Sequence, residues 1–275
     1  MKEESPPRLR FRDVRVRFDG VTALDLAELE VFDQSGLAIF LGPNGAGKSS
    51  LINAATGYVP IQAPGKVIFE NGVRYELSRL SRDRIVRSGI ARTFQTPALF
   101  PSLTVEESLQ LAAILGKPTG QSRRFISLFR QPKSHGSAVV LAGHLIEELG
   151  LQAVRQARMD ELSFPMLRRV ELGRALASQP RLLLLDEPSA GADGSETKLL
   201  VGLITHKLPE MIRLLFEKGL YRYPTLAIGL VTHDRVLLEG IAAGCCQEPV
   251  AHCFERGQLK TTCRLRHWLN STKAP

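Results

Sequence analysis

Hydrophobic and polar residues alternate near the start of the chain with the period of a β-strand. The alternation covers residues 12–18, and Gly20 ends it. Two more strand-like segments follow at residues 27–32 and 37–41. The second of them runs through a glycine-rich turn into residues 49–55, whose pattern predicts a helix. The sequence therefore predicts a strand, a glycine loop and a helix in that order.

The middle of the chain, residues 102–150, has leucines at helical spacing and is predicted to be largely helical. A basic, weakly apolar insertion at residues 117–137 interrupts it. The insertion fits either a solvated loop or a patch that faces a membrane surface or a permease. Farther on, residues 208–216 fit an extra amphipathic helix, which would serve internal packing or the docking of a partner.

Composition indicates a folded globular protein. The chain has 275 residues, of which 44% are hydrophobic and 23% charged, and this is enough apolar material for a packed core. No window approaches the roughly 18 consecutive apolar residues that a membrane span requires. The N-terminal segment is acidic and broken by Pro6 and Pro7, unlike a signal peptide. We therefore expect a cytoplasmic protein.

The net charge and the cysteines exclude few classes of function. A net charge of +8 suits binding to nucleic acid, to an anionic membrane surface or to the phosphates of a nucleotide. The cysteines match no zinc-binding spacing, so we expect reduced thiols without a metal. They are Cys245, Cys246, Cys253 and Cys263.

The glycine-rich turn after the strand at residues 37–41 satisfies the phosphate-loop pattern G-x-x-x-x-G-K-[ST]. Its glycines allow successive backbone N–H groups to point into one concavity, and the following helix adds the positive end of its dipole. Lys48 would reach the β- and γ-phosphates, and the Ser49 hydroxyl would be a ligand of Mg²⁺. A glycine-rich turn without a nucleotide is the alternative. The expected ATP-binding residues are Gly42, Pro43, Asn44, Gly45, Ala46, Gly47, Lys48, Ser49 and Ser50.

Two carboxylates follow a run of four leucines, residues 182–185, that is typical of a buried parallel strand. Asp186 would hold Mg²⁺ through water. Glu187 would polarise the attacking water as the general base for in-line attack on the γ-phosphate. A solvated acidic turn after a core strand would be the simpler interpretation, but the phosphate loop favours the catalytic one.

Residues 42–50, 186–191 and 231–234 together resemble the Walker A, the Walker B with D-loop, and the H-loop motifs of ABC-transporter ATPases. Their order and spacing are far more specific than any one of them alone. The resemblance extends from about residue 11 to residue 236. It implies an ATP-binding subunit that binds and hydrolyses ATP with Mg²⁺ as cofactor.

The resemblance also implies a fold. This fold is of the α/β class, a P-loop NTPase with a RecA-like core, an antiparallel β subdomain and a helical subdomain. A single ABC ATP-binding domain would occupy residues 8–265, with its helical subdomain at about residues 97–178. Residues 1–7 and 266–275 would be tails.

Three more residues gain roles from the resemblance. Gln95 falls at the Q-loop glutamine, which in the family contacts Mg²⁺ and couples the site to the membrane partner. His233 resembles the switch histidine that contacts the γ-phosphate, although a histidine after a strand can also be a simple cap. Phe18 sits where the family stacks an aromatic ring on adenine, but it also continues the face of Val14 and Val16 and would then be a core residue.

The signature motif departs from the family. Where Leu-Ser-Gly-Gly-Gln is expected, residues 162–166 contain Phe164 and Pro165 after the retained Ser163. Proline is tolerated in the first turn of a helix, but it has no N–H to donate to a γ-phosphate. In the family one cassette's signature loop closes on the ATP of another. The altered loop therefore suggests a heterodimer with a different cassette and one strong ATPase site, while a homodimer with an adequate loop remains the alternative.

The stretch at residues 92–100 and the basic insertion after it look most like ATPases of branched-chain amino acid and amide importers. This resemblance implies a subunit that drives import of such small solutes through separate integral membrane permeases, at the inner face of the plasma membrane. A non-transport ABC ATPase that acts on nucleic acid or ribosomes is one alternative. The chain has no tandem cassette and no heptad insertion, so we expect no nucleic acid partner. A regulatory subunit with little turnover is the other alternative.

Overall fold

The computed structural model describes residues 7–32, 36–94, 100–116 and 136–272. The chain forms two compact units. The first comprises Met1–Gln95, Arg181–Glu210 and Thr225–Pro275, and the second comprises Thr96–Pro180 and Met211–Pro224. The candidate phosphate loop and both candidate catalytic carboxylates therefore belong to the first unit.

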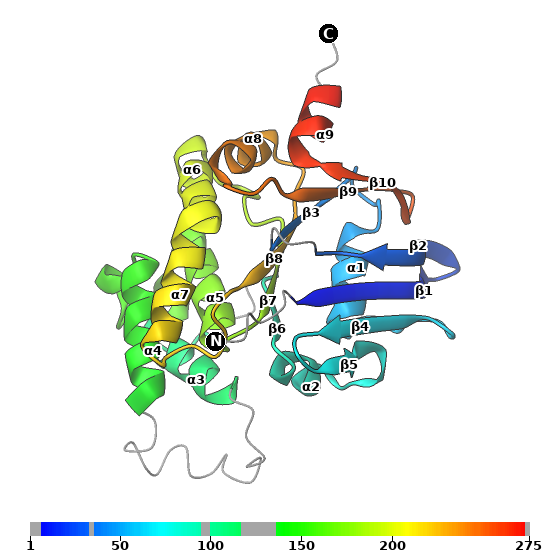
Figure 1. Ribbon diagram of the computed structural model, residues 1–275. Helices are drawn as coiled ribbons and strands as arrows, with labels where there is room; N and C mark the ends of the chain where they lie inside the picture. Colours follow the sequence, from blue (N-terminus) through cyan, green and yellow to red (C-terminus); the bar gives the residue numbers. More distant parts are fainter. Residues whose placement is uncertain (1–6, 33–35, 95–99, 117–135, 273–275) are drawn as a thin grey trace. The chain divides into compact units, whose positions relative to one another are not determined.

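The first unit contains an antiparallel sheet at its N-terminal end (Figure 1). Its strands, in spatial order, are β2 (Val21–Glu30), β1 (Arg8–Phe18), β4 (Lys66–Glu70) and β5 (Arg74–Glu76). One face of β1 is apolar and fully buried, and the other carries arginines. Cross-strand acids pair with these arginines, because Arg10, Arg12 and Arg15 lie within 4 Å of Glu30, Glu28 and Asp25. The basic residues of β1 are thus largely neutralised.

A second sheet in the same unit carries the strands that precede the sequence motifs. Its spatial order is β10 (Gln258–Arg264), β9 (Val250–Glu255), β3 (Leu37–Leu41), β8 (Ala227–Val231), β7 (Leu182–Asp186) and β6 (Ile90–Arg92). All pairs are parallel except β9 with β10. Every residue of β3, β7 and β8 is buried, as expected for strands covered on both faces. The carboxyl ends of the parallel strands therefore meet at one edge.

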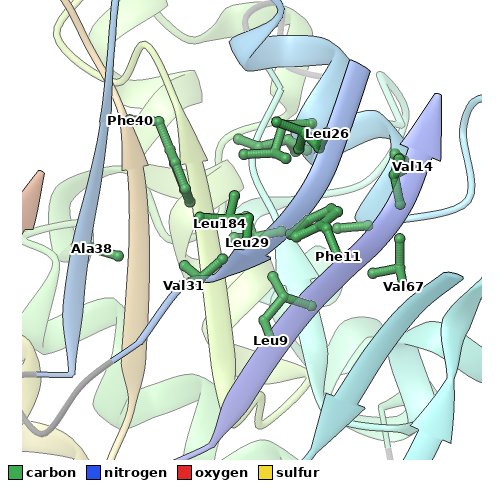
Figure 2. Packing of buried hydrophobic residues seen from close by; sticks show 14 of the residues in the cluster. Leu9, Phe11, Val14, Leu26, Leu29, Val31, Ala38, Phe40, Val67 and Leu184 are labelled. Atoms are coloured by element: carbon green, nitrogen blue, oxygen red, sulfur yellow. The ribbon is translucent and has the colours of Figure 1, made fainter. Parts of the chain in front are cut away.

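Apolar side chains of the two sheets form a common core. In Figure 2, Phe11 and Leu29 from the antiparallel sheet point toward Leu184 and Phe40 of the parallel sheet. Helix α1 (Lys48–Ala55) contributes Leu51 and further apolar residues to the same cluster. Since interiors are close-packed, this core fixes the helix that follows the phosphate loop against both sheets.

The remaining helices of the first unit follow strands of the parallel sheet or flank it. They are α2 (Arg82–Arg87), α6 (Gly194–Gly202), α8 (Arg235–Gly244) and α9 (Leu265–Ser271), with a π-helical turn at Leu203–Lys207. Helix α9 lies in the segment that the sequence pattern treats as a tail. An aspartate caps both α6 and α8, because Asp193 and Asp234 accept hydrogen bonds from the first free backbone N–H groups.

The second unit is helical, as the leucine spacing predicts. Its helices are α3 (Val105–Leu115), α4 (Gly136–Glu148) and α5 (Phe164–Ala177), which pack on one another. Thr104 and Glu107 form a capping box that fixes the start of α3. Most of the basic insertion, residues 117–135, lies outside the described residues.

The predicted extra helix is confirmed as α7 (Leu208–Glu217), which begins in the first unit and ends in the second. Its apolar face is buried, with Ile212 and Leu215 at 3% exposure or less. This burial supports the internal-packing interpretation. Within the described residues, no helix combines the length and apolar character that crossing a bilayer demands.

Candidate functional site

The phosphate loop joins β3 to α1 and takes a conformation that only glycines adopt without strain. Gly42, Gly45 and Gly47 have φ angles of 146°, 79° and 95°. A β-carbon on Gly42 would lie 2.3 Å from the carbonyl oxygen of Phe254. One on Gly47 would lie 2.6 Å from the carbonyl oxygen of Ala23. The glycines of the motif therefore meet two needs, the left-handed backbone and the close approach of neighbouring strands.

Lys48 folds back over this loop. Its Nζ donates hydrogen bonds to the carbonyl oxygens of Gly42 at 2.8 Å and Pro43 at 3.0 Å. Burial lowers the pKa of Lys48, while the nearby carboxylates of Glu187 and Asp186 raise it. The ammonium group thus stands at the loop between backbone carbonyls and two acidic side chains, where an anionic phosphate would relieve the cost of its burial.

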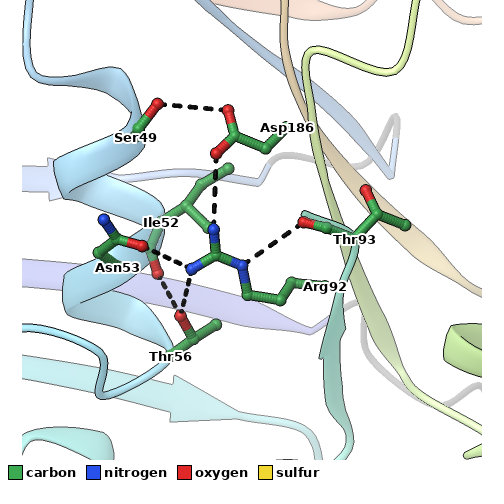
Figure 3. A network of polar contacts seen from close by, with 7 residues as sticks. All are labelled: Ser49, Ile52, Asn53, Thr56, Arg92, Thr93 and Asp186. Atoms are coloured by element: carbon green, nitrogen blue, oxygen red, sulfur yellow. Dashed lines mark hydrogen bonds and ion pairs between the residues drawn. The ribbon is translucent and has the colours of Figure 1, made fainter. Parts of the chain in front are cut away.

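Ser49 and Asp186 meet at the end of β7. The Ser49 hydroxyl donates a hydrogen bond to Asp186 Oδ1 at 3.3 Å, as Figure 3 shows. Burial raises the pKa of Asp186, and the guanidinium of Arg92 and the hydrogen bond from Ser49 oppose that rise. The side chain is only 3% exposed. A buried carboxylate needs such compensation to stay charged.

The pairing of a hydroxyl with a carboxylate suits Mg²⁺. This ion takes oxygen ligands and is usually bound by one or two protein carboxylates together with waters and substrate phosphates. Among the residues that the structure describes, no group of three His, Cys, Asp or Glu side chains could hold a metal by itself. Ser49 and Asp186 therefore fit a cation that arrives with a nucleotide.

Glu187 is turned back toward the sheet by its own backbone. Its φ is 50°, in the left-handed region, and its N–H donates to the carbonyl oxygen of Val231 at 2.9 Å. A non-glycine residue held in this region is strained, and such strain concentrates at functional sites. His233, just past the end of β8, lies beside it, with Nδ1 donating to Glu187 Oε1 at 3.0 Å. Adjacent parallel strands thus bring together two residues that are 46 positions apart in the sequence.

Two other predicted residues have different outcomes. Phe18 ends β1 with 46% of its surface exposed, whereas Val14 and Val16 are fully buried. Phe18 pairs with the exposed Val21 at the hairpin end of β1, beyond the buried part of this strand. Its interpretation as a core residue is therefore wrong, and its ring is accessible for stacking. Gln95 lies outside the described residues.

The altered signature segment starts α5. Ser163 adopts an extended backbone at the N-cap position without a side-chain capping hydrogen bond, and Pro165 stands in the first turn. This confirms that the proline is tolerated there. The guanidinium of Arg168 lies 4.7 Å above the ring of Phe164, one turn away. The signature segment belongs to the second unit, whereas the phosphate loop belongs to the first.

The structure also shows contacts that the sequence did not predict. The turn between β9 and β10 reaches the phosphate loop, because the Gly257 N–H donates to the carbonyl oxygen of Ala46 at 3.2 Å. The Gly257 carbonyl accepts from the Asp25 N–H at 2.7 Å. Arg92, at the end of β6, contacts both α1 and Asp186. A glycine after Arg256, which has a left-handed backbone, indicates a turn. The neighbouring sequence does not predict that this turn contacts the phosphate loop.

Comparison with known proteins places this geometry in context. Residues 28–190 match the ABC transporter family. The chain is 31% identical over 241 residues to the high-affinity branched-chain amino acid transport ATP-binding protein LivG of Escherichia coli strain K12, covering 86% of each chain. It is 30% identical over 248 residues to the probable branched-chain amino acid transport ATP-binding protein LivG of Methanocaldococcus jannaschii, covering 88% of this chain and 91% of the relative.

A solved structure agrees with the fold. The chain superposes with a TM-score of 0.69, at 27% identity, on the ADP conformation of an ATP-binding cassette of an ABC transporter. The superposition covers 98% of this chain and 97% of the other. The predicted fold class, an α/β P-loop ATPase cassette, is thereby confirmed.

We predict that Gly42→Ala disrupts the phosphate loop beyond the cost of backbone strain. A β-carbon at Gly42 meets the carbonyl oxygen of Phe254, whereas one at Gly72, in the turn between β4 and β5, meets nothing within 4 Å. Both residues have positive φ, so each substitution strains the backbone, and Gly72→Ala shows the effect of such strain away from the site. Gly72→Ala should bind ATP as the wild type does. Gly42→Ala should bind it roughly tenfold or more weakly, a loss of about 1.4 kcal/mol or more.

Isothermal titration with ATP measures this difference, and urea unfolding of both variants provides the control for stability. Equal ATP affinities in Gly42→Ala and Gly72→Ala would show that the close approach at Gly42 does not shape the site.

Proposed function

Since the chain belongs to the ABC transporter family, as an ATP-binding subunit with ATPase activity, we propose that it drives import of branched-chain amino acids, amides or similar small solutes through separate permease subunits. The names of two relatives at 30–31% identity, both transport ATP-binding proteins for branched-chain amino acids, support this class of solute. The permeases would hold the chain at the inner face of the plasma membrane.

In the proposed mechanism the phosphate loop binds the triphosphate. The backbone N–H groups of residues 44–49 and the N-terminus of α1 would face anionic oxygens, and Lys48 would exchange its contacts with loop carbonyls for the β- and γ-phosphates. Ser49 and Asp186 would hold Mg²⁺, the aspartate through water. When bound, this ion neutralises charge that develops on the phosphate oxygens. The exposed ring of Phe18 stacks on the adenine.

Hydrolysis requires a base next to the γ-phosphate, and Glu187 takes this role. The observation that carries the assignment is the 3.0 Å hydrogen bond between Glu187 and His233 at the carboxyl edge of the same sheet that bears the phosphate loop. His233 orients the carboxylate and contacts the γ-phosphate. Glu187 accepts a proton from the attacking water. Gln95, which lies outside the described residues, would add a ligand to Mg²⁺ and couple the site to the permease.

A second cassette completes the ATPase. Pro165 removes one N–H from the loop that would close on a γ-phosphate, and Ser163 remains as a partial substitute. A lost hydrogen bond to a charged group is worth about 1.5–3 kcal/mol. The site built on this chain's phosphate loop is therefore strong when a different cassette supplies an intact signature loop, and the reciprocal site is weak.

The described surface favours transport over action on nucleic acid. Arg10, Arg12 and Arg15 of β1 pair with acids of β2, so little of this basic strip is left for a phosphate backbone. A purely regulatory role is disfavoured by the assembled site, because the carboxylate of Glu187 and the ring of His233 already form their catalytic contact.

Affinity purification of the chain from detergent-solubilised membranes tests the transport role. We expect integral membrane permeases and a second ABC ATPase to copurify with it. Recovery with ribosomes or DNA instead, insensitive to detergent, would overturn the proposal.

Glu187→Gln should leave ATP binding intact and lower turnover by a factor of about 10²–10⁴, the usual contribution of a general base. Glu239→Gln, on the exposed side of α8, makes the same chemical change away from the site and should leave turnover unchanged. Phosphate release and ATP titration measure the two quantities. Wild-type turnover in Glu187→Gln would remove the assigned base.

Pro165→Gly restores an N–H to the signature segment. If the loop limits the reciprocal site, this variant should raise the ATPase rate of the chain purified alone by about one to two powers of ten. Pro101→Gly, an exposed proline in the same unit, is the matched control. A homodimer with full activity that Pro165→Gly does not increase would contradict the proposed heterodimer.

A further inference from the structure

One buried arginine near the proposed magnesium site has no role in the mechanism above. Arg92 ends β6, and its backbone pairs in parallel with Leu184 of β7, two residues before Asp186. Its side chain is 9% exposed. Burying a guanidinium is costly unless its donors are satisfied, so the groups around Arg92 are informative.

The guanidinium connects three elements of the first unit. As Figure 3 shows, Nη1 donates to Asn53 Oδ1 at 2.6 Å and to Thr56 Oγ1 at 3.1 Å, both on α1. Nη2 donates to Asp186 Oδ2 on β7 at 3.5 Å. The planar group also lies 4.5 Å from the ring centre of Phe94 and 5.1 Å from that of Tyr58. Such stacking holds the plane of the guanidinium in place.

These contacts fix the positions of the two candidate magnesium ligands, Ser49 and Asp186. Asp186 is held at both ends of its carboxylate, with Oδ1 at Ser49 and Oδ2 at Arg92. Asn53 lies one turn after Ser49 on α1, on the same face of the helix. Arg92 therefore fixes the rotation of the carboxylate and, through Asn53, the helix that carries the hydroxyl.

We propose that Arg92 is a positioning residue for Mg²⁺, which keeps Asp186 aligned with Ser49. The inference rests on the proposed function, because it assumes that Ser49 and Asp186 bind Mg²⁺. Arg92 does not touch the nucleotide in this account. It acts through Asp186 and α1.

An opposing effect is the repulsion between a guanidinium and a divalent cation. Arg92 contacts Oδ2, whereas the oxygen that faces Ser49 is Oδ1, so the cation would approach the carboxylate from the other oxygen. The contact with Asp186 is also longer than those with Asn53 and Thr56. Because the guanidinium and the cation would contact different oxygens of the carboxylate, we expect loss of the guanidinium to weaken metal binding.

Lysine cannot replace this arginine. Its ammonium is a point charge without the planar fork, so it cannot bridge Asn53, Thr56 and Asp186 in one fixed geometry. Arg92→Lys thus keeps a positive charge beside Asp186 and removes the alignment. Arg82→Lys is the matched control, because the Arg82 guanidinium lies 4.8 Å from the ring centre of the same Tyr58 but has no part in the site.

The test titrates Mg²⁺ into the purified chain with a non-hydrolysable ATP analogue and follows analogue binding, with an EDTA series for metal-free affinity. In Arg92→Lys we expect the half-saturating Mg²⁺ concentration to rise at least fivefold while metal-free affinity stays within twofold of the wild type. Arg82→Lys should match the wild type in both. Asn53→Ala should raise the Mg²⁺ concentration at least twofold, and the double variant should not exceed Arg92→Lys alone, since the two residues act as one unit.

Several outcomes would overturn the inference. One is a half-saturating Mg²⁺ concentration in Arg92→Lys that rises less than twofold, or falls. Another is a loss of analogue binding that is equal with and without Mg²⁺, which indicates a general structural role. If Arg92→Lys does not fold, Asn53→Ala tests the inference alone. A rise of less than twofold in its half-saturating Mg²⁺ concentration would then overturn it. Wild-type binding that is independent of Mg²⁺ would instead contradict the proposed magnesium site itself.

Discussion

The parallel pairing of β3, β8 and β7 is the constraint on which the site depends. These strands are buried along their whole length, so no polar side chain can be placed within them without cost. Parallel strands also end at the same edge, and there the backbone leaves the core. The phosphate loop follows β3, Asp186 ends β7 with Glu187 directly after it, and His233 lies two residues past the end of β8. The polar and charged groups of the site lie at this edge because the interiors of the strands are buried and apolar.

The charges at this edge are held at a cost in free energy. Burial raises the pKa of Asp186 and lowers the pKa of Lys48, so the folded state disfavours the charged form of each side chain. For Asp186 the stability penalty grows as the pH rises through its ordinary range, and for Lys48 it grows as the pH falls below its ordinary pKa. Arg92 and Lys48 oppose the rise at Asp186, and Glu187 and Asp186 oppose the fall at Lys48, whereas Glu187 adds to the rise at Asp186. This balance suits a site whose remaining compensation comes from a bound anion and a cation.

The sequence predicted most of the fold and much of the site, for a local reason. The strand, glycine loop and helix at residues 37–55 and the proline in the first turn of α5 are signalled by neighbouring residues. The hydrogen-bond partners of Arg92 on α1 and β7 are not, because they lie 36 to 94 positions away and only the order of strands in the sheet brings them together. The approach of Gly257 to the phosphate loop was missed for the same reason. Phe18 was ambiguous because the alternation of β1 does not show where along the strand the buried face ends.

The central claim is that Ser49 and Asp186 receive Mg²⁺ while the loop at residues 42–49 binds the triphosphate. A crystal structure of the chain with Mg²⁺ and a non-hydrolysable ATP analogue tests it most directly. We expect an octahedral ion with the Ser49 hydroxyl as a ligand at about 2.0–2.1 Å, a water between the ion and Asp186, and the phosphates on the N-terminus of α1. An analogue bound elsewhere, or an ion that contacts neither residue, would contradict it.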